Sequence, residues 1–153
     1  MQIINNHPFS ALVFETDTTL SDLNQHVGHV ARDLAADALA SGLDLAGPVY
    51  WVYEGADGRP DTHFHLTIAQ PVLGTADAPT RYTRREMPPF ASLQQLHYGS
   101  WPDLCAAYQS LIGAAMQQNL KLSGISRELY IQMDGEHPQR NVTLVQLGVD
   151  GMI

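Results

Sequence analysis

The sequence has only one cysteine, few basic residues and no long apolar run. Cys105 stands alone, which excludes an internal disulfide and a zinc site built from several cysteines. No apolar stretch approaches the roughly 18 residues that a membrane-spanning helix needs. No basic start followed by an apolar segment marks a secretory signal. These absences predict a cytoplasmic protein without a membrane partner.

Basic residues are outnumbered by acidic ones, with 8 Lys and Arg against 16 Asp and Glu and a net charge of −8. Direct nucleic-acid binding is disfavoured, because phosphate contacts need a cationic face. The nearest basic cluster is Arg81, Arg84 and Arg85, and Glu86 follows it directly. The acidic balance favours solubility, and its long-range field also attracts cationic ligands or basic partners.

The length of 153 residues and the hydrophobic content of 44% fit one domain, residues 1–153, with a substantial core. Apolar spacing predicts one amphipathic helix over Leu20–Ser41, ended by Gly42, and another from Ser100 to about Asn119. Composition predicts strands at Pro8–Phe14, Val49–Tyr53, Thr62–Val72, Phe90–Tyr98, Gly124–Met133 and Asn141–Val149. The proline-containing segment Leu73–Pro89 is expected to be a connector.

Each half therefore reads strand, helix, strand, strand, which indicates an internal repeat of residues 8–72 and 90–149. Gly42-Leu43-x-x-x-Gly47 aligns with Asn119-Leu120-x-x-x-Gly124 at an offset of 77 residues. The same offset aligns Trp51 with Glu128 and Tyr53 with Tyr130. We expect an α+β fold in which duplicated β-α-β-β units form one antiparallel sheet. Two helices would cover one face, and the other face would be a concave ligand pocket shared by the halves.

The strand Gly124–Met133 contains an unusual charge. Period-two alternation separates two sets of side chains, Leu129, Ile131 and Met133 on one face and Glu128, Tyr130 and Gln132 on the other. The apolar face is expected to pack on a helix. Glutamate is depleted in strands and is rarely buried without a partner. Glu128 therefore faces water, a structural partner such as an arginine or a tyrosine hydroxyl, or a ligand.

Several ordered motifs carry a family resemblance. They are His97-Tyr-Gly-Ser-Trp-x-x-Leu104, Ala107-Tyr108, Gly124-x-x-Arg-Glu-x-Tyr130, Pro138 and Thr143-x-x-Gln146. This set resembles the GyrI-like small-molecule-binding family, also called the bacterial transcription activator effector-binding domain. The resemblance implies the duplicated fold and a central pocket for hydrophobic, cationic and aromatic compounds. Many relatives carry a helix-turn-helix segment first; Met1–Pro8 is too short for one, so a stand-alone form is expected.

The resemblance implies that Glu128 meets the positive charge of the ligand, because a glutamate of the matching strand does so in that family. Together with the repeat, it predicts these ligand-binding residues: Glu128, Tyr130, Trp51, Tyr53, His63 and His65. Aromatic residues such as Trp51 and Tyr53 are also typical of plain core. Trp101 and Tyr108 are interpreted as core packing.

His63 and His65 lie at i and i+2 and are expected to line the pocket as polar groups. They would hold a metal only if a third ligand converged, and no metal is expected. The sequence contains no Ser-His-Asp order, P-loop or dinucleotide glycine pattern, so no cofactor is expected either.

The leading hypothesis is a non-enzymatic module that senses or sequesters a small-molecule ligand, a lipophilic cation. The resemblance also implies an alternative, because some GyrI-like proteins hydrolyse cyclopropane-containing genotoxic compounds; in such a hydrolase Glu128 and Tyr130 would act on a water molecule. Another is a protein-interaction modulator. A homodimer or a protein partner is compatible with each of the three.

Overall fold

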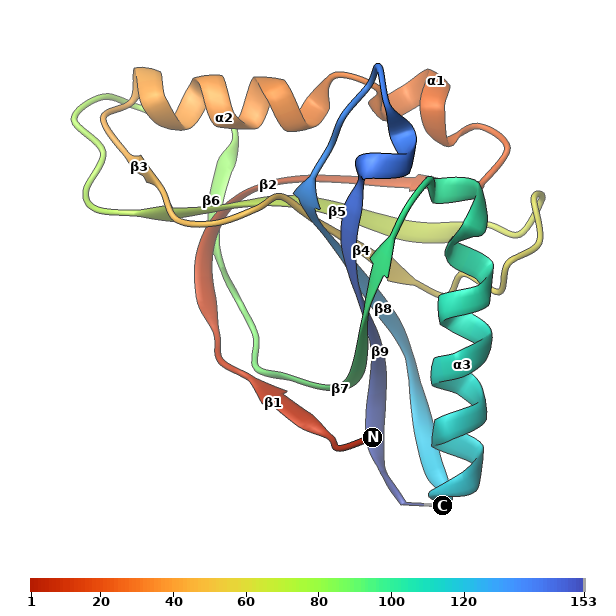
Figure 1. Cartoon of the computed structure of the whole chain (residues 1–153). Helices are drawn as coiled ribbons and strands as arrows, with labels where there is room; N and C mark the ends of the chain where they lie inside the picture. Colours follow the sequence, from red (N-terminus) through yellow and green to blue (C-terminus); the bar gives the residue numbers. More distant parts are fainter. Residues whose placement is uncertain (153) are drawn as a thin grey trace. The chain divides into compact units, whose positions relative to one another are not determined.

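The computed structural model describes residues 1–152, which belong to two compact units. The N-terminal unit is Pro8–Pro88, and the C-terminal unit joins residues 89–152 to Met1–His7. Both units combine helices with antiparallel strands (Figure 1). The predicted α+β class is therefore confirmed.

The N-terminal unit is a sheet with a helix packed on it. Its elements are β2 (Phe9–Thr18), α1 (Leu23–Val27), α2 (Val30–Ala40), β3 (Asp44–Leu45), β4 (Tyr50–Glu54), β5 (Phe64–Leu73) and β6 (Thr83–Met87). The strand order is β4-β5-β2-β6, and the short β3 also pairs with β5. Helix α2 packs on β2, β3 and β5 and buries Val30, Leu34 and Ala38, which recur every fourth residue.

The helix predicted over Leu20–Ser41 is two helices, α1 and α2, separated by Gly28 and His29. Gly28 keeps helical dihedral angles, and the chain leaves helical geometry at His29, which has φ of −123° and ψ of 1°. The predicted end is confirmed. Gly42 follows α2 with φ of +86°, a conformation that glycine adopts without strain.

The segment expected to be a connector contains β6, which pairs with β2 at the edge of the N-terminal sheet. Its sequence, Thr83-Arg-Arg-Glu-Met87, lacks apolar alternation. Charged residues are common on edge strands, where they oppose pairing with other chains. Composition alone therefore could not distinguish this strand from a loop.

The C-terminal unit repeats the theme of one helix on a sheet. Its elements are β1 (Ile4–Asn6), β7 (Phe90–Tyr98), the 3₁₀ turn η1 (Trp101–Asp103), α3 (Leu104–Gln117), β8 (Leu120–Gln132), the 3₁₀ turn η2 (Pro138–Arg140) and β9 (Val142–Met152). The strand order is β1-β7-β9-β8, with antiparallel neighbours. The strand β1 was not predicted, since it has three residues and two of them are asparagine, which is depleted in strands.

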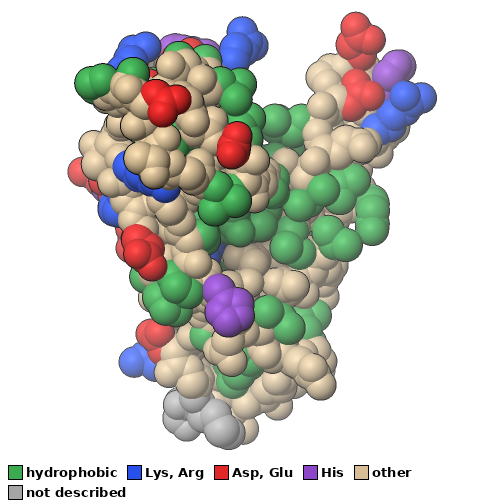
Figure 2. All heavy atoms as spheres, turned by 90° about the vertical axis from the view of Figure 1, so that its left-hand side faces the viewer, with side chains coloured by type: hydrophobic (Ala, Val, Ile, Leu, Met, Phe, Trp, Pro, Cys, Tyr) green, Lys and Arg blue, Asp and Glu red, His purple; other side chains and the backbone are tan. Residues whose placement is uncertain are grey.

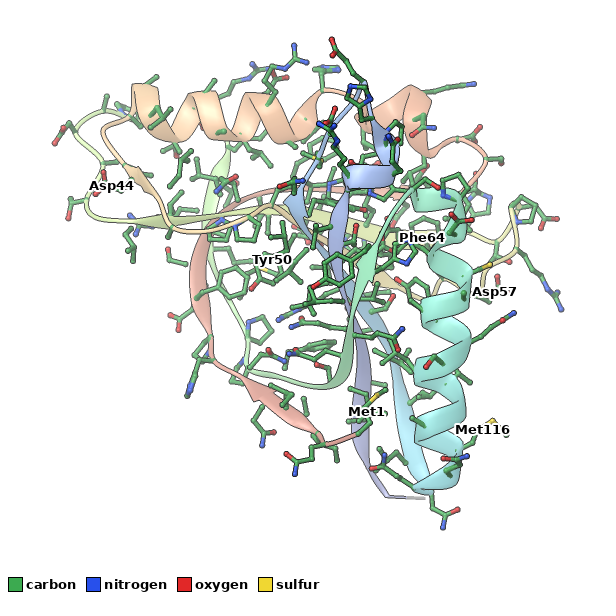
Figure 3. All side chains as sticks on the ribbon, viewed as in Figure 1. Met1, Asp44, Tyr50, Asp57, Phe64 and Met116 are labelled. Atoms are coloured by element: carbon green, nitrogen blue, oxygen red, sulfur yellow. The ribbon has the colours of Figure 1, made fainter. Side chains whose placement is uncertain are left out.

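Helix α3 supplies the core of the C-terminal unit. Its buried residues are Leu104, Ala107, Leu111 and Ala115. They pack on a cluster from the strands, made of Leu93, Leu120, Val145, Leu147 and Val149. The opposite side of the helix is open, and Met116 lies on it with 72% of its surface exposed (Figure 3).

Strand β8 begins four residues before the predicted start at Gly124. Gly124 has φ of +81° and lies where the register with β9 shifts, between Leu122 and Ser126. Such an irregularity lets a strand continue through a residue that would otherwise end it.

The described surface carries mixed charge. On the side drawn in Figure 2, basic and acidic side chains are interspersed, and no continuous basic stripe appears among the described residues there. None of the helices in residues 1–152 is long and apolar enough to cross a membrane.

Candidate functional site

Glu128 lies in β8 on the face of the sheet that α3 covers. Its partner across the ladder is Val145 of β9, which belongs to the core packed on α3. Directly opposed residues of an antiparallel pair project to the same face. Glu128 therefore points to the α3 side and is only 8% exposed. The expectation that it faces away from the helix is wrong.

The apolar set expected beneath the helix does not lie there. Leu129 pairs with Leu144 on the opposite face of β8 and is buried. Ile131 lies where the register shifts between Tyr130 and Gln132, Met133 follows the end of β8, and these two residues are 51% and 54% exposed. Alternation defines the two faces of a strand without saying which of them a helix covers. The apolar surface beneath α3 comes mainly from β7 and β9.

Two tyrosine hydroxyls bind the Glu128 carboxylate. Tyr108 of α3 donates to Oε2 at 2.5 Å, and Tyr130 of β8 donates to Oε1 at 2.7 Å. Hydrogen bonds from O–H to a carboxylate are short and strong, and they offset the cost of removing the charge from water. Tyr130 was predicted for the site. Tyr108 was expected to pack in the core, and it does pack against the cluster beneath α3. Its hydrogen bond to Glu128 was not predicted, although the need of a tyrosine hydroxyl for a partner was an available signal.

Trp101 extends the aromatic surface beside the carboxylate. Its ring centroid lies 5.3 Å from that of Tyr130, with the planes tilted by 58°. Trp101 is 44% exposed, so the indole forms a boundary between Tyr130 and solvent. This half-exposed position differs from the buried core position expected for it.

The turn that carries Trp101 is fixed by hydrogen bonds. His97 Nε2 lies 2.9 Å from the carbonyl oxygen of Ser100, which can only accept, so Nε2 donates. The Ser100 hydroxyl donates to Asp103 at 3.0 Å. Pro102 also stiffens η1, because its ring fixes φ. The indole is thereby held in place from β7 and from within its own turn.

Thr143 adds a buried hydroxyl to the same face. It pairs with His97 of β7 and with Tyr130 of β8. Thr143 is fully buried, and its Oγ1 has no hydrogen-bond partner among the described residues. The site thus contains a polar atom that a bound molecule or water would satisfy.

Arg127 precedes Glu128 and projects to the other face, opposite Gln146. It is 1% exposed, and its guanidinium carbon lies 4.1 Å from the centroid of the Phe90 ring, a cation–π geometry. Tyrosine hydroxyls, one kind of structural partner that the sequence left open for Glu128, are observed.

The predicted residues Trp51 and Tyr53 lie on β4 of the N-terminal unit. Tyr53 is buried, with its ring centroid 5.5 Å from that of Phe64. Trp51 is half-buried and pairs with Ile68 of β5. The two-sided pocket that sets Trp51 opposite Glu128 stays a prediction.

The histidines predicted for the site also lie in the N-terminal unit. His63 is exposed and precedes β5, so it lies outside the strand that contains His65. His65 contacts Asp17 at 2.9 Å through Nδ1 and Glu15 at 3.1 Å through Nε2. Arg85 also donates to Glu15, at 2.8 Å. Both ring nitrogens of His65 are therefore engaged by carboxylates.

These contacts shift the ionisation of the cluster. The hydrogen bond to Asp17, followed by that to Glu15, raises the pKa of His65 above its ordinary value of 6.5. The hydrogen bond from His65, with those of Arg85, lowers the pKa of Glu15 below 4.5. Among the described residues, no group of three His, Cys, Asp or Glu side chains is arranged to hold a metal ion.

No protein-family model matches the chain, and no curated protein matches its sequence. Solved structures match its fold. The C-terminal domain of EcmrR superposes with a TM-score of 0.71 and 16% identity, over 99% of this chain and 98% of that one. The resemblance to GyrI-like effector-binding domains is thus confirmed at the level of the fold.

Three further structures extend this likeness. SAV2435 bound to tetraphenylphosphonium matches with a TM-score of 0.61 and 15% identity, over 98% of this chain and 93% of that one. A hydrolase encoded by lin2189 from Listeria innocua matches with a TM-score of 0.67 and 12% identity, over 97% of this chain and 91% of that one. EcmrR in its complex with DNA matches at a TM-score of 0.73 and 16% identity, and the match covers 99% of this chain but only 58% of EcmrR.

Proposed function

We propose that the Glu128 site binds a hydrophobic, cationic, aromatic small molecule, and that the chain acts as a sensor or sequestering module for it. The observation that carries this proposal is the nearly buried carboxylate, held by two tyrosine hydroxyls beside the ring of Trp101. A few placed polar groups within an aromatic surface are typical of small-molecule sites.

The charge and the rings favour the same class of ligand. The two hydroxyl donors offset the cost of burying the Glu128 carboxylate, so the proposal places a negative charge at low exposure. A delocalised organic cation gives up little hydration on entering, and each ring face adds about 0.5–2 kcal/mol of cation–π attraction. The net charge of −8 also attracts a cation over longer distances.

The comparison with SAV2435 supports this ligand class. That protein was solved with tetraphenylphosphonium, a lipophilic cation, and it shares the fold of this chain. The proposal transfers the ligand class, and it assigns the charge-recognising role to Glu128.

Isothermal titration calorimetry with tetraphenylphosphonium tests the proposal. Glu128→Gln should weaken binding by about tenfold or more, the equivalent of about 1.4 kcal/mol or more, because the amide carries no charge. Glu136→Gln is the matched control, since Glu136 is exposed in the turn after β8. Equal affinity for both variants, or no binding of this or related lipophilic cations by the parent protein, would refute the proposal.

A second candidate is a hydrolase, favoured by the shared fold with the Listeria innocua hydrolase and by the carboxylate–tyrosine pair. Glu128 would take a proton from an attacking water, with Tyr130 orienting it. Incubation of the protein with a cyclopropane-containing DNA-alkylating compound, followed by mass spectrometry, tests this activity. Product formation that Glu128→Gln abolishes would support it; an unchanged compound in excess protein would rule out that substrate.

A further inference from the structure

The outer face of α3 carries no charged side chain. None of the 14 residues of this helix is charged, and its buried side packs on the sheet. The helix α2 of the N-terminal unit, in contrast, carries Arg32, Asp33 and Asp37. A surface helix ordinarily presents charged and polar groups to water. The outer face of α3 is therefore an unusual surface for a chain with a net charge of −8.

Four exposed residues of this helix have the spacing of a helix-packing seam. They are Cys105, Gln109, Ile112 and Met116, and we call them the α3 seam. They follow one another after four, three and four positions, as the a and d residues of paired helices do. Met116 projects away from the sheet with 72% of its surface exposed (Figure 3), and Ile112 is 38% exposed. The buried residues of α3 form a separate stripe, so the seam is open to another helix.

The α3 seam is complementary to itself when two copies of the helix pack antiparallel. A two-fold axis midway along the seam sets the long Met116 against the small Cys105 of the second copy. The same axis sets Ile112 against Gln109. Gly113 is exposed beside the seam and leaves room for the helices to approach to about 8–10 Å between their axes. Antiparallel packing also brings opposite ends of the two helix dipoles together, which a parallel arrangement does not.

Charge favours a second copy as the occupant of this face. A partner helix with charged residues would have to remove them from water against a seam that offers no opposite charge. The rest of an acidic surface repels another copy of the chain, whereas two α3 faces meet without a pair of like charges. A helix of this length extends only about 21 Å. The contact is therefore smaller than the roughly 1,200–2,000 Å² of stable complexes, which makes the association weak.

We propose that the α3 seam is the interface of a weak, antiparallel homodimer of this chain. The interface lies on the outer side of α3, whereas Tyr108 of the same helix packs against the core and contacts Glu128 on the inner side. The inference therefore stands apart from the proposed function, and it assigns a use to a surface that the ligand hypothesis leaves unexplained.

Sedimentation equilibrium of the full chain, from about 10 µM to 1 mM, tests the interface. We expect a monomer–dimer equilibrium with a Kd on the order of 100 µM. Raising the salt concentration should tighten the dimer, because it screens the repulsion between two acidic copies. Met116→Glu should weaken it by about tenfold or more, since each copy would bury a carboxylate without a partner. Leu39→Glu is the matched control and should leave the Kd unchanged, because Leu39 is 62% exposed on α2.

Mild oxidation with diamide tests the orientation, because the one native thiol lies on the seam. In the antiparallel dimer Cys105 lies opposite Met116, so the parent protein should form little disulfide-linked dimer. Met116→Cys sets a new thiol against Cys105 of the second copy and should increase the linked dimer severalfold. Leu39→Cys is the control, and its yield should match that of the parent.

A parent protein that stays monomeric up to 1 mM would overturn the proposal. So would a dimer that Met116→Glu leaves intact, or one that Leu39→Glu weakens equally, because its interface would lie elsewhere. Efficient linkage through Cys105 in the parent, without a gain in Met116→Cys, would overturn the antiparallel arrangement. Circular dichroism checks that each variant folds. If Met116→Glu does not fold, Ile112→Gln replaces it, with a loss of dimer again expected.

Discussion

Replacing Tyr108 by phenylalanine should weaken the attachment of α3 to β8. The substitution keeps the ring in place and removes the hydroxyl that donates to Glu128 Oε2 at 2.5 Å. A hydrogen bond to a charged group contributes about 1.5–3 kcal/mol, and Glu128 is too buried for water to replace the donor freely. We therefore expect the free energy of unfolding to fall by about 1.5–3 kcal/mol.

Urea unfolding followed by circular dichroism measures this change, with Tyr98→Phe as the exposed control. The slope with urea should stay constant, so that the shift of the midpoint reports stability alone. The double variant Tyr108→Phe with Glu128→Gln completes a cycle that isolates the pairwise energy. A coupling energy within about 0.5 kcal/mol of zero would refute the reasoning, since contacting groups ordinarily couple more strongly.

Three further predictions concern the rest of the chain. His65→Gln should cost most stability between about pH 4.5 and 6.5. The raised pKa of His65 makes its stabilising contribution complete below pH 6.5 and lost as the pH rises through the folded pKa, and the lowered pKa of Glu15 means that the contribution is lost on the acid side only below about pH 4.5. Urea titrations from pH 4 to 9 test this, and a stability difference between variant and parent that does not change with pH would contradict it. Leu111→Ala deletes a fully buried side chain under α3 and should cost about 2–5 kcal/mol in the same assay. Gly148→Ala would place a methyl group against Ser123 Oγ, 2.5 Å from the Ile125 carbonyl oxygen and 2.8 Å from the Phe90 ring, and should destabilise by about 1–3 kcal/mol. A thermal midpoint equal to that of the parent would contradict this prediction.

The sequence predicted an element correctly where its composition and its flanking residues indicated the same structure. Strand β7 spans Phe90–Tyr98 as predicted, because its composition and flanking residues favour the same assignment. Gly42 ends α2 at the predicted position, because its positive φ of 86° is a conformation that glycine adopts without strain. The α+β class followed from the order of such elements.

Features that depend on contacts between elements were harder to predict. The face of β8 that α3 covers is decided by Leu93, Val145 and Leu147 on other strands, so the alternation around Glu128 did not reveal it. The role of Tyr108 depends on a carboxylate 20 residues away in the chain. Strand β6 exists because β2 offers a pairing edge, and its own charged sequence gives little sign of it.

The glutamate itself was identifiable from the sequence, since a carboxylate in an apolar strand requires an explanation. What the structure adds is the pair of hydroxyls that stabilise it and the indole beside Tyr130. The ligand hypothesis rests on these groups together with the carboxylate.

The central claim is that the charge of Glu128 recognises a cation, and two probes of nearly the same shape test it most directly. Tetraphenylphosphonium and tetraphenylborate present similar phenyl surfaces with opposite charge. Calorimetry on the parent protein should show binding of the phosphonium and none of the borate, and Glu128→Gln should remove most of that difference. Equal binding of the two ions by the parent protein, or a phosphonium preference that persists undiminished in Glu128→Gln, would contradict the claim.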